Sequence, residues 1–461
     1  MAIEKYNSWT RNRRTAIPTV AAIASVFIFS TTVAVASDAG VDRHLADSLA
    51  STYDTSSSNS PLIDSMSTLD DYLAYAAIES PALRRAFYRW RAALEKSGYA
   101  GALPDPMLSF HYFIENVETR VGPQEQRLSL KQSFPWFGTL GARREMASQQ
   151  AQTAYRQYQS AKLKLNYSVK AAYYDYYYLG RDIALTRDNL ELLTFWESIA
   201  RVKYKVALKR HPDIIKAQVE LGKLEDQLLT LQDRVVPAAS RLRALLNLPP
   251  TVVLPIPETI EIDEVVLSSD SVLAAALTHN PDLGAMQHII AREQAGVSLA
   301  RKASLPSFTV GADYIATGAA VNPALSESGK DPWIVGVGVS LPIWFGKNSS
   351  KRHEARAKYQ AAQYDFSDAK NQLAAYVDKL MFEYADAMRR ANLYRDGLVP
   401  KAEQALNANY SAYQADETDF LNVLDAQRQL LSFQLSLEKA WADLATCRAE
   451  IELVIGYEVN K

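Results

Sequence analysis

The few side chains in this sequence that could carry out chemistry lack the partners that such chemistry requires. His353-Glu354 begins like the zinc-protease pattern His-Glu-x-x-His, but the fifth position is Ala357, so the second histidine ligand is missing. Cys447 is the only cysteine, which excludes an internal disulfide, a CxxC redox site and a cysteine-rich zinc site. No G-x-S-x-G, P-loop or G-x-G-x-x-G motif is present. We therefore expect no enzyme activity, no cofactor and no metal site.

Composition excludes a further class of partner. The 461 residues include 50 basic and 52 acidic side chains, a net charge of -2. Bulk-charge binding to nucleic acid requires a basic protein, so we expect no nucleic-acid partner. Six histidines are scattered without ligand spacing, and we interpret them as ordinary polar residues. They are His44, His111, His211, His279, His288 and His353.

The first 36 residues predict export. Four basic residues precede an apolar stretch from Ala16 to Val35, which ends in the small-residue cleavage pattern Ala34-Val35-Ala36. A membrane anchor is the rival interpretation, but a proline and several hydroxyl residues dilute the stretch below the ~20 apolar residues of a spanning helix. No later stretch reaches 18 apolar residues, so a mature chain that crossed a membrane would need the strands of a closed β-barrel.

The rest of the chain consists of two similar halves. Ser80-Pro81-Ala82-Leu83 returns as Asn280-Pro281-Asp282-Leu283, and Phe134-Pro135-Trp136-Phe137-Gly138 returns as Leu341-Pro342-Ile343-Trp344-Phe345-Gly346. A proline-rich stretch that begins at Pro249 and cannot be helical separates the halves. We predict a signal peptide at 1–36, a flexible mature N-terminus at 37–66, a first repeat at 67–248, a connector at 249–269, a second repeat at 270–457 and a tail at 458–461.

Each half is expected to contain a helix, two strands, a very long helix, a break and a return helix. The first helices are placed at about Leu69–Tyr99 and Ser271–Lys302. No proline interrupts Gly141 to His211, and roughly 70 helical residues at ~1.5 Å each would reach about 105 Å. The final helix carries apolar residues at alternating steps of three and four, the spacing of a coiled-coil seam. They are Val423, Ala426, Leu430, Phe433, Leu437, Ala440, Leu444, Cys447, Ile451 and Val454.

The expected strands alternate between apolar and polar residues. Leu108, Phe110 and Tyr112 alternate with Ser109 and His111. The other half shows the same pattern in two stretches, around Val310 and around Val337. Such strands are typical of a membrane barrel wall or of a half-buried soluble sheet. Aromatic residues at both junctions between strand and helix favour the membrane and would form an interfacial girdle. They are Trp136, Phe137, Trp344 and Phe345.

Four strands cannot close a barrel, because the smallest membrane barrels have about eight. The chain must therefore oligomerise to pair its strand edges. A dimer with eight strands and a trimer with twelve are both compatible with this count.

From about Leu69 to Tyr457 the sequence resembles the TolC-like family of outer-membrane efflux channels. The matching features are the tandem halves, the Phe134-Pro135-Trp136-Phe137-Gly138 junction, and Tyr413 with Val423-Leu424-Asp425-Ala426-Gln427. The resemblance implies an α+β membrane protein: a homotrimer whose 12-stranded β-barrel, four strands per chain, continues as a long α-helical coiled-coil tunnel in the periplasm. It also implies a passive exit duct in the bacterial outer membrane, in contact with its lipid.

The resemblance implies protein partners and a site of contact with them. Family members dock onto a periplasmic adaptor, a membrane fusion protein, which an inner-membrane pump serves. The breaks between long and return helices are expected to form the tip that meets the adaptor, with a solvated loop as the simpler interpretation. The first break comprises Val206, Ala207, Leu208, Lys209, Arg210 and Asp213. The second comprises Tyr413, Ala415, Asp416, Glu417 and Thr418.

The resemblance also places a pore gate just inside the second tip. Family carboxylate rings match Asn422 and Asp425 here, and only Asp425 keeps the carboxylate. The arginine that locks the family's tip is replaced by Thr418, although its tyrosine partner is kept as Tyr413. A ring of three Asp425 carboxylates would favour cations. Alternatively, Asp425 only stabilises the start of the return helix.

Two questions stay open from the sequence. The first is whether the chain is instead a periplasmic coiled-coil adaptor or a structural spacer. A channel should pellet with the outer membrane and need detergent, whereas osmotic shock should release an unanchored adaptor or spacer. The second is the substrate, because metal cations, organic toxins and peptides are all compatible with this composition.

Overall fold

The computed structural model describes residues 38–55, 63, 67–205, 211–260, 265, 267–322 and 324–459. The expected signal peptide at 1–36 lies outside these residues. The chain divides into two units, Met1–Leu45 and Ala46–Lys461. Only the start of helix α2 (Asp38–Thr55) is described in the first unit.

Four antiparallel strands form one sheet in the order β1-β2-β3-β4. The first half supplies β1 (Met107–Thr119) and β2 (Gly122–Phe134), and the second supplies β3 (Ser307–Thr317) and β4 (Trp333–Ser340). The central pair β2–β3 joins the two halves over a register that runs from Gln124 opposite Thr317 to Phe134 opposite Phe308. The outer edges of β1 and β4 have no partner strand within the described residues.

The two faces of the sheet differ as the alternation predicts. Leu108, Phe110 and Val335 are 66%, 63% and 77% exposed, so one face is both apolar and uncovered. On the other face, Asp313 of β3 accepts hydrogen bonds from Ser129 and Arg127 of β2. A hydrogen-bonded polar group on one face and bare apolar side chains on the other are the reverse of a soluble sheet, whose apolar face is covered.

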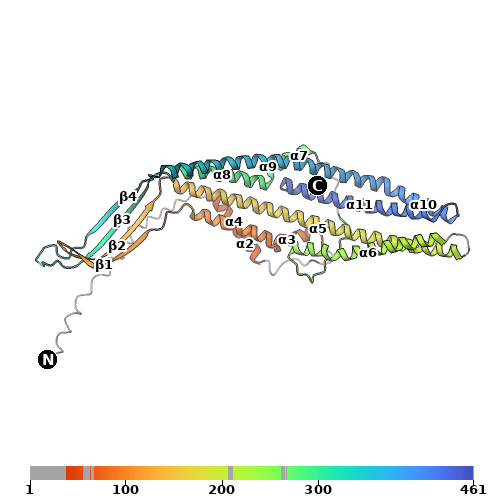
Figure 1. Ribbon diagram of the computed structural model, residues 1–461, viewed down its shortest axis with the longest axis horizontal. Helices are drawn as coiled ribbons and strands as arrows, with labels where there is room; N and C mark the ends of the chain where they lie inside the picture. The colour runs from red at the N-terminus through yellow and green to blue at the C-terminus, as the bar shows by residue number, and fades with distance from the viewer. Residues whose placement is uncertain are drawn as a thin grey trace, which may run out of the picture. The chain divides into compact units, whose positions relative to one another are not determined.

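Long helices run from the base of the sheet, as Figure 1 shows. In the first half α5 (Thr139–Lys205) is 67 residues long and is followed by α6 (His211–Leu246). In the second half α9 (Phe345–Leu393) and α10 (Val399–Gln414) are followed by α11 (Phe420–Ile455). Within the described ranges, no helix combines the length and the apolar character that crossing a membrane requires.

The first helix of each half is in fact two helices, which corrects the expectation. α3 (Leu69–Glu79) and α4 (Pro81–Tyr99) are separated at Ser80, and α7 (Ser269–His279) and α8 (Pro281–Lys302) at Asn280. Proline disfavours helical backbone in the residue before it, so the chain must restart there. Asn280 caps the new helix by accepting from the backbone N–H groups of Asp282 and Leu283, at 2.9 and 3.1 Å.

The long helix of the second half is also interrupted. Tyr394–Leu398 forms a π-helical turn, η2, between α9 and α10. Pro400 lies two residues beyond this turn, where it can neither donate to the helix nor tolerate the carbonyl of Asp396. The wider turn accommodates the proline without breaking the rod.

The mature N-terminus, expected to be flexible, contains helix α2. Within the second unit Ala46, Ala50 and Tyr53 are buried, and the hydroxyl groups of Tyr53 and Tyr158 are 3.1 Å apart. The Tyr53 ring also packs on Phe87 of α4. The many serine and aspartate residues suggested disorder, but one apolar stripe is enough to fold the helix onto an aromatic cluster.

Candidate functional site: the helix tips

The turn between α10 and α11 lies where the sequence placed the second break. α10 ends at Gln414 and α11 begins at Phe420, so the turn comprises Ala415–Asp419. Asp416 adopts a positive φ of 63°, a conformation that aspartate tolerates better than most residues. Ala415, Asp416 and Glu417 are exposed, while Thr418 is half-buried.

The first break falls almost entirely outside the described residues. Val206, Ala207, Leu208, Lys209 and Arg210 lie outside the described residues. Asp213 lies in the first turn of α6, and its side chain is also outside the description.

Tyr413 and Asn422 do not have similar surroundings. Tyr413 is 1% exposed, and its ring packs on Phe420 with the ring centroids 5.3 Å apart. Asn422 is exposed and donates to the Thr418 hydroxyl at 2.7 Å. The tyrosine therefore holds the two ends of the turn together, and Asn422 and Thr418 pair across its outer side.

Asp425 points into a charged group that the sequence did not predict. Arg428, one turn further along α11, donates from Nη1 to Asp425 at 3.2 Å. The same guanidinium donates from Nε to Glu220 Oε1 on α6 at 2.9 Å, and from Nη2 to the other oxygen of Glu220. A two-pronged contact of this kind fixes orientation as well as charge. Arg428 thus links the return helix of the second half to the return helix of the first.

A second contact lies one residue away. Gln427 is 2% exposed and donates to Asn189 Oδ1 of α5 at 3.0 Å. We call Asn189, Glu220, Gln427 and Arg428 the tip clasp. Glu220 and Arg428 lie nine and eight residues into their helices, so at ~1.5 Å per residue both are about 12 Å from the helix starts.

An apolar cluster supports the tip clasp from within. Leu193, Ala217, Phe420, Val423 and Leu424 are all buried in one cluster contributed by α5, α6 and α11. The hairpin of α5 and α6 therefore packs on the hairpin of α10 and α11 through an apolar core as well as through the clasp.

The contacts within the clasp shift the pKa values of Glu220 and Arg428. The hydrogen bond from Arg428 holds the pKa of Glu220 below its ordinary value, although burial opposes this. The pKa of Arg428 is correspondingly raised, mainly by its hydrogen bond to Glu220. Both side chains are therefore charged over the whole neutral range.

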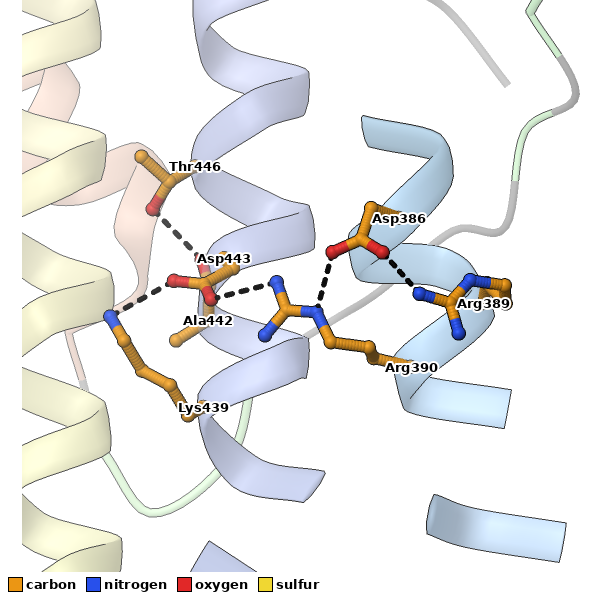
Figure 2. A network of polar contacts seen from close by, with 7 residues as sticks. All are labelled: Asp386, Arg389, Arg390, Lys439, Ala442, Asp443 and Thr446. Atoms are coloured by element: carbon orange, nitrogen blue, oxygen red, sulfur yellow. Dashed lines mark hydrogen bonds and ion pairs between the residues drawn. The ribbon is translucent and has the colours of Figure 1, made fainter. Parts of the chain in front are cut away.

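A second ionic network joins α9 to α11 further from the tip (Figure 2). Asp443 of α11 accepts from Lys439 at 2.9 Å and from Arg390 of α9 at 3.3 Å. Arg390 also contacts Asp386 at 2.9 Å, and Asp386 pairs with Arg389 on the same helix. Arg390 thus bridges two helices, whereas Arg389 remains within α9.

The same level of α11 is also tied to α5. Glu438 accepts from the Tyr177 hydroxyl at 2.6 Å and from Arg181 at 2.9 Å. The Lys439 ammonium lies 5.3 Å from the centroid of the Tyr178 ring. α11 is therefore held on both sides above the tip, and among the contacts of the described residues the clasp is the polar link between α11 and the first half that lies nearest the tip.

The aromatic residues of the expected girdle lie where the strands meet the helices. Phe137, Trp344 and Phe345 are 79%, 69% and 78% exposed. Trp136 is half-buried because its ring stacks on Phe308 of β3.

Cys447 lies on the seam of α11, as expected. Burial raises the pKa of its thiol to about 12, which keeps it in the unreactive protonated form. Among the described residues, no three His, Cys, Asp or Glu side chains are grouped as metal ligands would be.

Sequence reasoning located the turn but missed the clasp, and its assignment of Asp425 to a pore gate stays a prediction. The spacing of three between Asp425 and Arg428 was a visible signal for a helical ion pair. No local signal connects Arg428 with Glu220, 208 residues earlier.

Comparison with known proteins agrees with this architecture. The pattern of the family described as Outer membrane efflux protein matches residues 73–248 and 272–457, one stretch in each half. Nodulation protein T of Rhizobium leguminosarum bv. trifolii is 21% identical over 379 residues, which are 78% of this chain and 79% of that protein.

Solved structures show the same fold. The outer membrane protein VceC of Vibrio cholerae superposes with a TM-score of 0.71 at 20% identity, over 85% of this chain and 97% of VceC. The outer-membrane channel OprN gives 0.73 at 18% identity, over 86% and 93%.

The two repeats, the four-stranded sheet and the long helices are those of an efflux channel and not of an adaptor, a spacer or an enzyme. The family pattern covers well over half of the chain. The chain belongs to the outer membrane efflux protein family and is an outer-membrane channel of tripartite efflux pumps, with its helical part in the periplasm.

Proposed function

We propose that three copies of this chain assemble into a duct with a 12-stranded barrel and a helical tunnel. The observation that carries this proposal is the sheet, which has two unpaired edges and an uncovered apolar face. Unpaired backbone groups in lipid cost several kcal/mol each, so β1 of one copy must pair with β4 of the next. The sheet supports closure, and the family supports three copies as the number that closes it.

The oligomeric state of detergent-solubilised protein tests this assembly. Native mass measurement should give three times the chain mass. Cysteine pairs placed on facing positions of β1 and β4, in a Cys447→Ser background, should cross-link between copies and not within one copy. A folded, stable monomer or dimer would contradict the proposal.

We propose further that the tips form both the gate and the docking surface for a periplasmic adaptor, which an inner-membrane pump serves. The exposed turn residues Ala415, Asp416 and Glu417 suit contact with a partner, while buried Tyr413 holds the turn in place. Asp425 is more than half exposed as well as paired with Arg428, so it supplies negative charge to the gate. Asn422 can supply only a neutral amide.

The tip clasp is the proposed lock of this gate. It joins α11 to α5 and α6, so the second hairpin cannot move away from the first without breaking it. Thr418 stands at the position of the family's tip-locking arginine and has no charge, so Arg428 takes over the role of closing the tip. Opening then requires that Arg428 and Glu220 separate and both become hydrated.

A further inference from the structure

A cavity of about 780 Å³ lies among four helices near the base of the sheet. It is bounded by the end of α4, the start of α5, the second half of α8 and the fourth to sixth turns of α9. Six charged side chains line it: Lys96, Arg143, Arg292, Glu293, Lys358 and Asp365.

The arrangement of these helices places the cavity on one face of a curved layer. α4 packs on α5, α5 on α8, and α8 on α9, so the four helices follow one another in a row. A single cavity that touches all four must lie on the concave side of that row. When three copies close into a tube, their concave faces turn inward. The cavity therefore belongs to the tunnel wall, a placement that rests on the proposed trimer.

The charge of the cavity is positive. Four cations stand against two carboxylates, a net charge of +2 per copy. Arg292 is already committed, because it contacts Glu293 at 2.6 Å and the Gln150 carbonyl at 2.5 Å. Lys358 is paired with Glu354 at 2.6 Å. Lys96, Arg143 and Asp365 form no ion pair with any described residue, so once the paired groups are set aside, two cations face the cavity against one carboxylate.

Apolar side chains make up another part of the lining, which we call the apolar floor. Met146, Ile289, Leu299 and Ala362 contribute to the lining. An apolar floor with free cations at its edge suits a ligand with a hydrophobic body and an anionic group. A hydrated inorganic anion would leave the floor unused, and a metal cation would be repelled by Lys96 and Arg143.

We propose that this cavity is a transit site for amphiphilic organic anions on the tunnel wall, with Lys96 and Arg143 as the anion-binding pair. Three such sites surround the tunnel and place six Lys96 and Arg143 side chains at one level. The site retains a passing anion by its head group while the apolar body rests on α5 and α8.

Single-channel recordings in planar bilayers test the proposal with two probes of equal ring size and opposite charge. Naphthalene-1-sulfonate should block the wild-type channel at lower concentration than 1-naphthylmethylammonium, and inorganic sulfate should block least. Lys96→Gln with Arg143→Gln removes the net charge and should raise the blocking concentration of naphthalene-1-sulfonate about fivefold. Lys96→Glu with Arg143→Glu should reverse the preference between the two probes.

Lys401→Gln is the matched control, because Lys401 is an exposed lysine of α10 outside the cavity. It should leave block unchanged. If both probes blocked the wild-type channel equally, or if both double variants were blocked like wild type, the proposed site would be refuted. The proposed duct would be unaffected by either result. A wild-type protein that forms no conducting channel would instead refute the duct, and the site with it.

Discussion

Breaking the tip clasp should open the channel. The informative change is Arg428→Gln, which keeps most of the side-chain volume but removes the charge that faces Glu220. Glu220 is 10% exposed at its side chain and Arg428 is 45% exposed, so the pair lies between a surface ion pair and a buried one.

The magnitude follows from that intermediate exposure. Surface ion pairs contribute ~0.2–1 kcal/mol, and removing one partner of a fully buried pair costs ~3–5 kcal/mol. We take ~1 kcal/mol per copy as the coupling between Arg428 and Glu220, at the upper end of the surface range because the contact is two-pronged. If three copies open together, ~3 kcal/mol shifts the ratio of open to closed channels by roughly a hundredfold.

The assay is single-channel recording in planar bilayers. Arg428→Gln and Glu220→Gln should each raise the open fraction. The double variant should be no more open than either single variant, because both remove the same contact. Arg389→Gln is the matched control, since the Asp386 pair that it breaks lies within one helix. The proposed lock would be refuted if both single variants had the open fraction of wild type. It would also be refuted if Arg389→Gln raised the open fraction as much as they do.

The clasp also predicts a dependence on pH. The folded-state pKa of Glu220 is lowered, so the clasp stabilises the closed tip fully above the ordinary glutamate pKa of about 4.3. This stabilisation is lost as the pH falls through the lowered value. Wild type should therefore open in acid, whereas Glu220→Gln should show no such transition.

Four further outcomes are expected. Asp425→Asn should lower cation selectivity and weaken block by trivalent cations, and identical values to wild type would remove Asp425 from the pore. Charge reversal at Lys209 and Arg210 should reduce efflux in cells without reducing the trimer yield, and unchanged efflux would argue against an adaptor contact at that tip. Phe87→Ala should destabilise the helical part by ~3–5 kcal/mol, seen as a lower thermal midpoint, because Phe87 is 0% exposed in an aromatic cluster. Cys447 should react with iodoacetamide at pH 8 far more slowly than a cysteine in an unfolded control, since its thiol pKa is about 12.

Much of the fold could be predicted from the sequence because it depends on local patterns. The repeated Phe134-Pro135-Trp136-Phe137-Gly138 motif located both junctions between strands and helices, and alternation located the four strands. The proline-free stretch from Gly141 predicted the 67-residue helix α5. The breaks at Ser80 and Asn280 could also have been predicted, because each residue precedes a proline. We instead predicted one continuous helix in each half, because the residues on both sides of the break have a helical pattern.

The sequence by itself determined the two repeats, the strand faces, the seam of α11 and the turn at Ala415–Asp419, because each follows from spacing within one element. Only the tertiary structure decided that Arg428 meets Glu220, that α2 folds onto Tyr158, and that Lys96 and Arg143 share a cavity. These contacts join side chains 208, 105 and 47 positions apart. Periodicity fixes which face of a helix a residue occupies, but the partner of that face is fixed only when the helices pack.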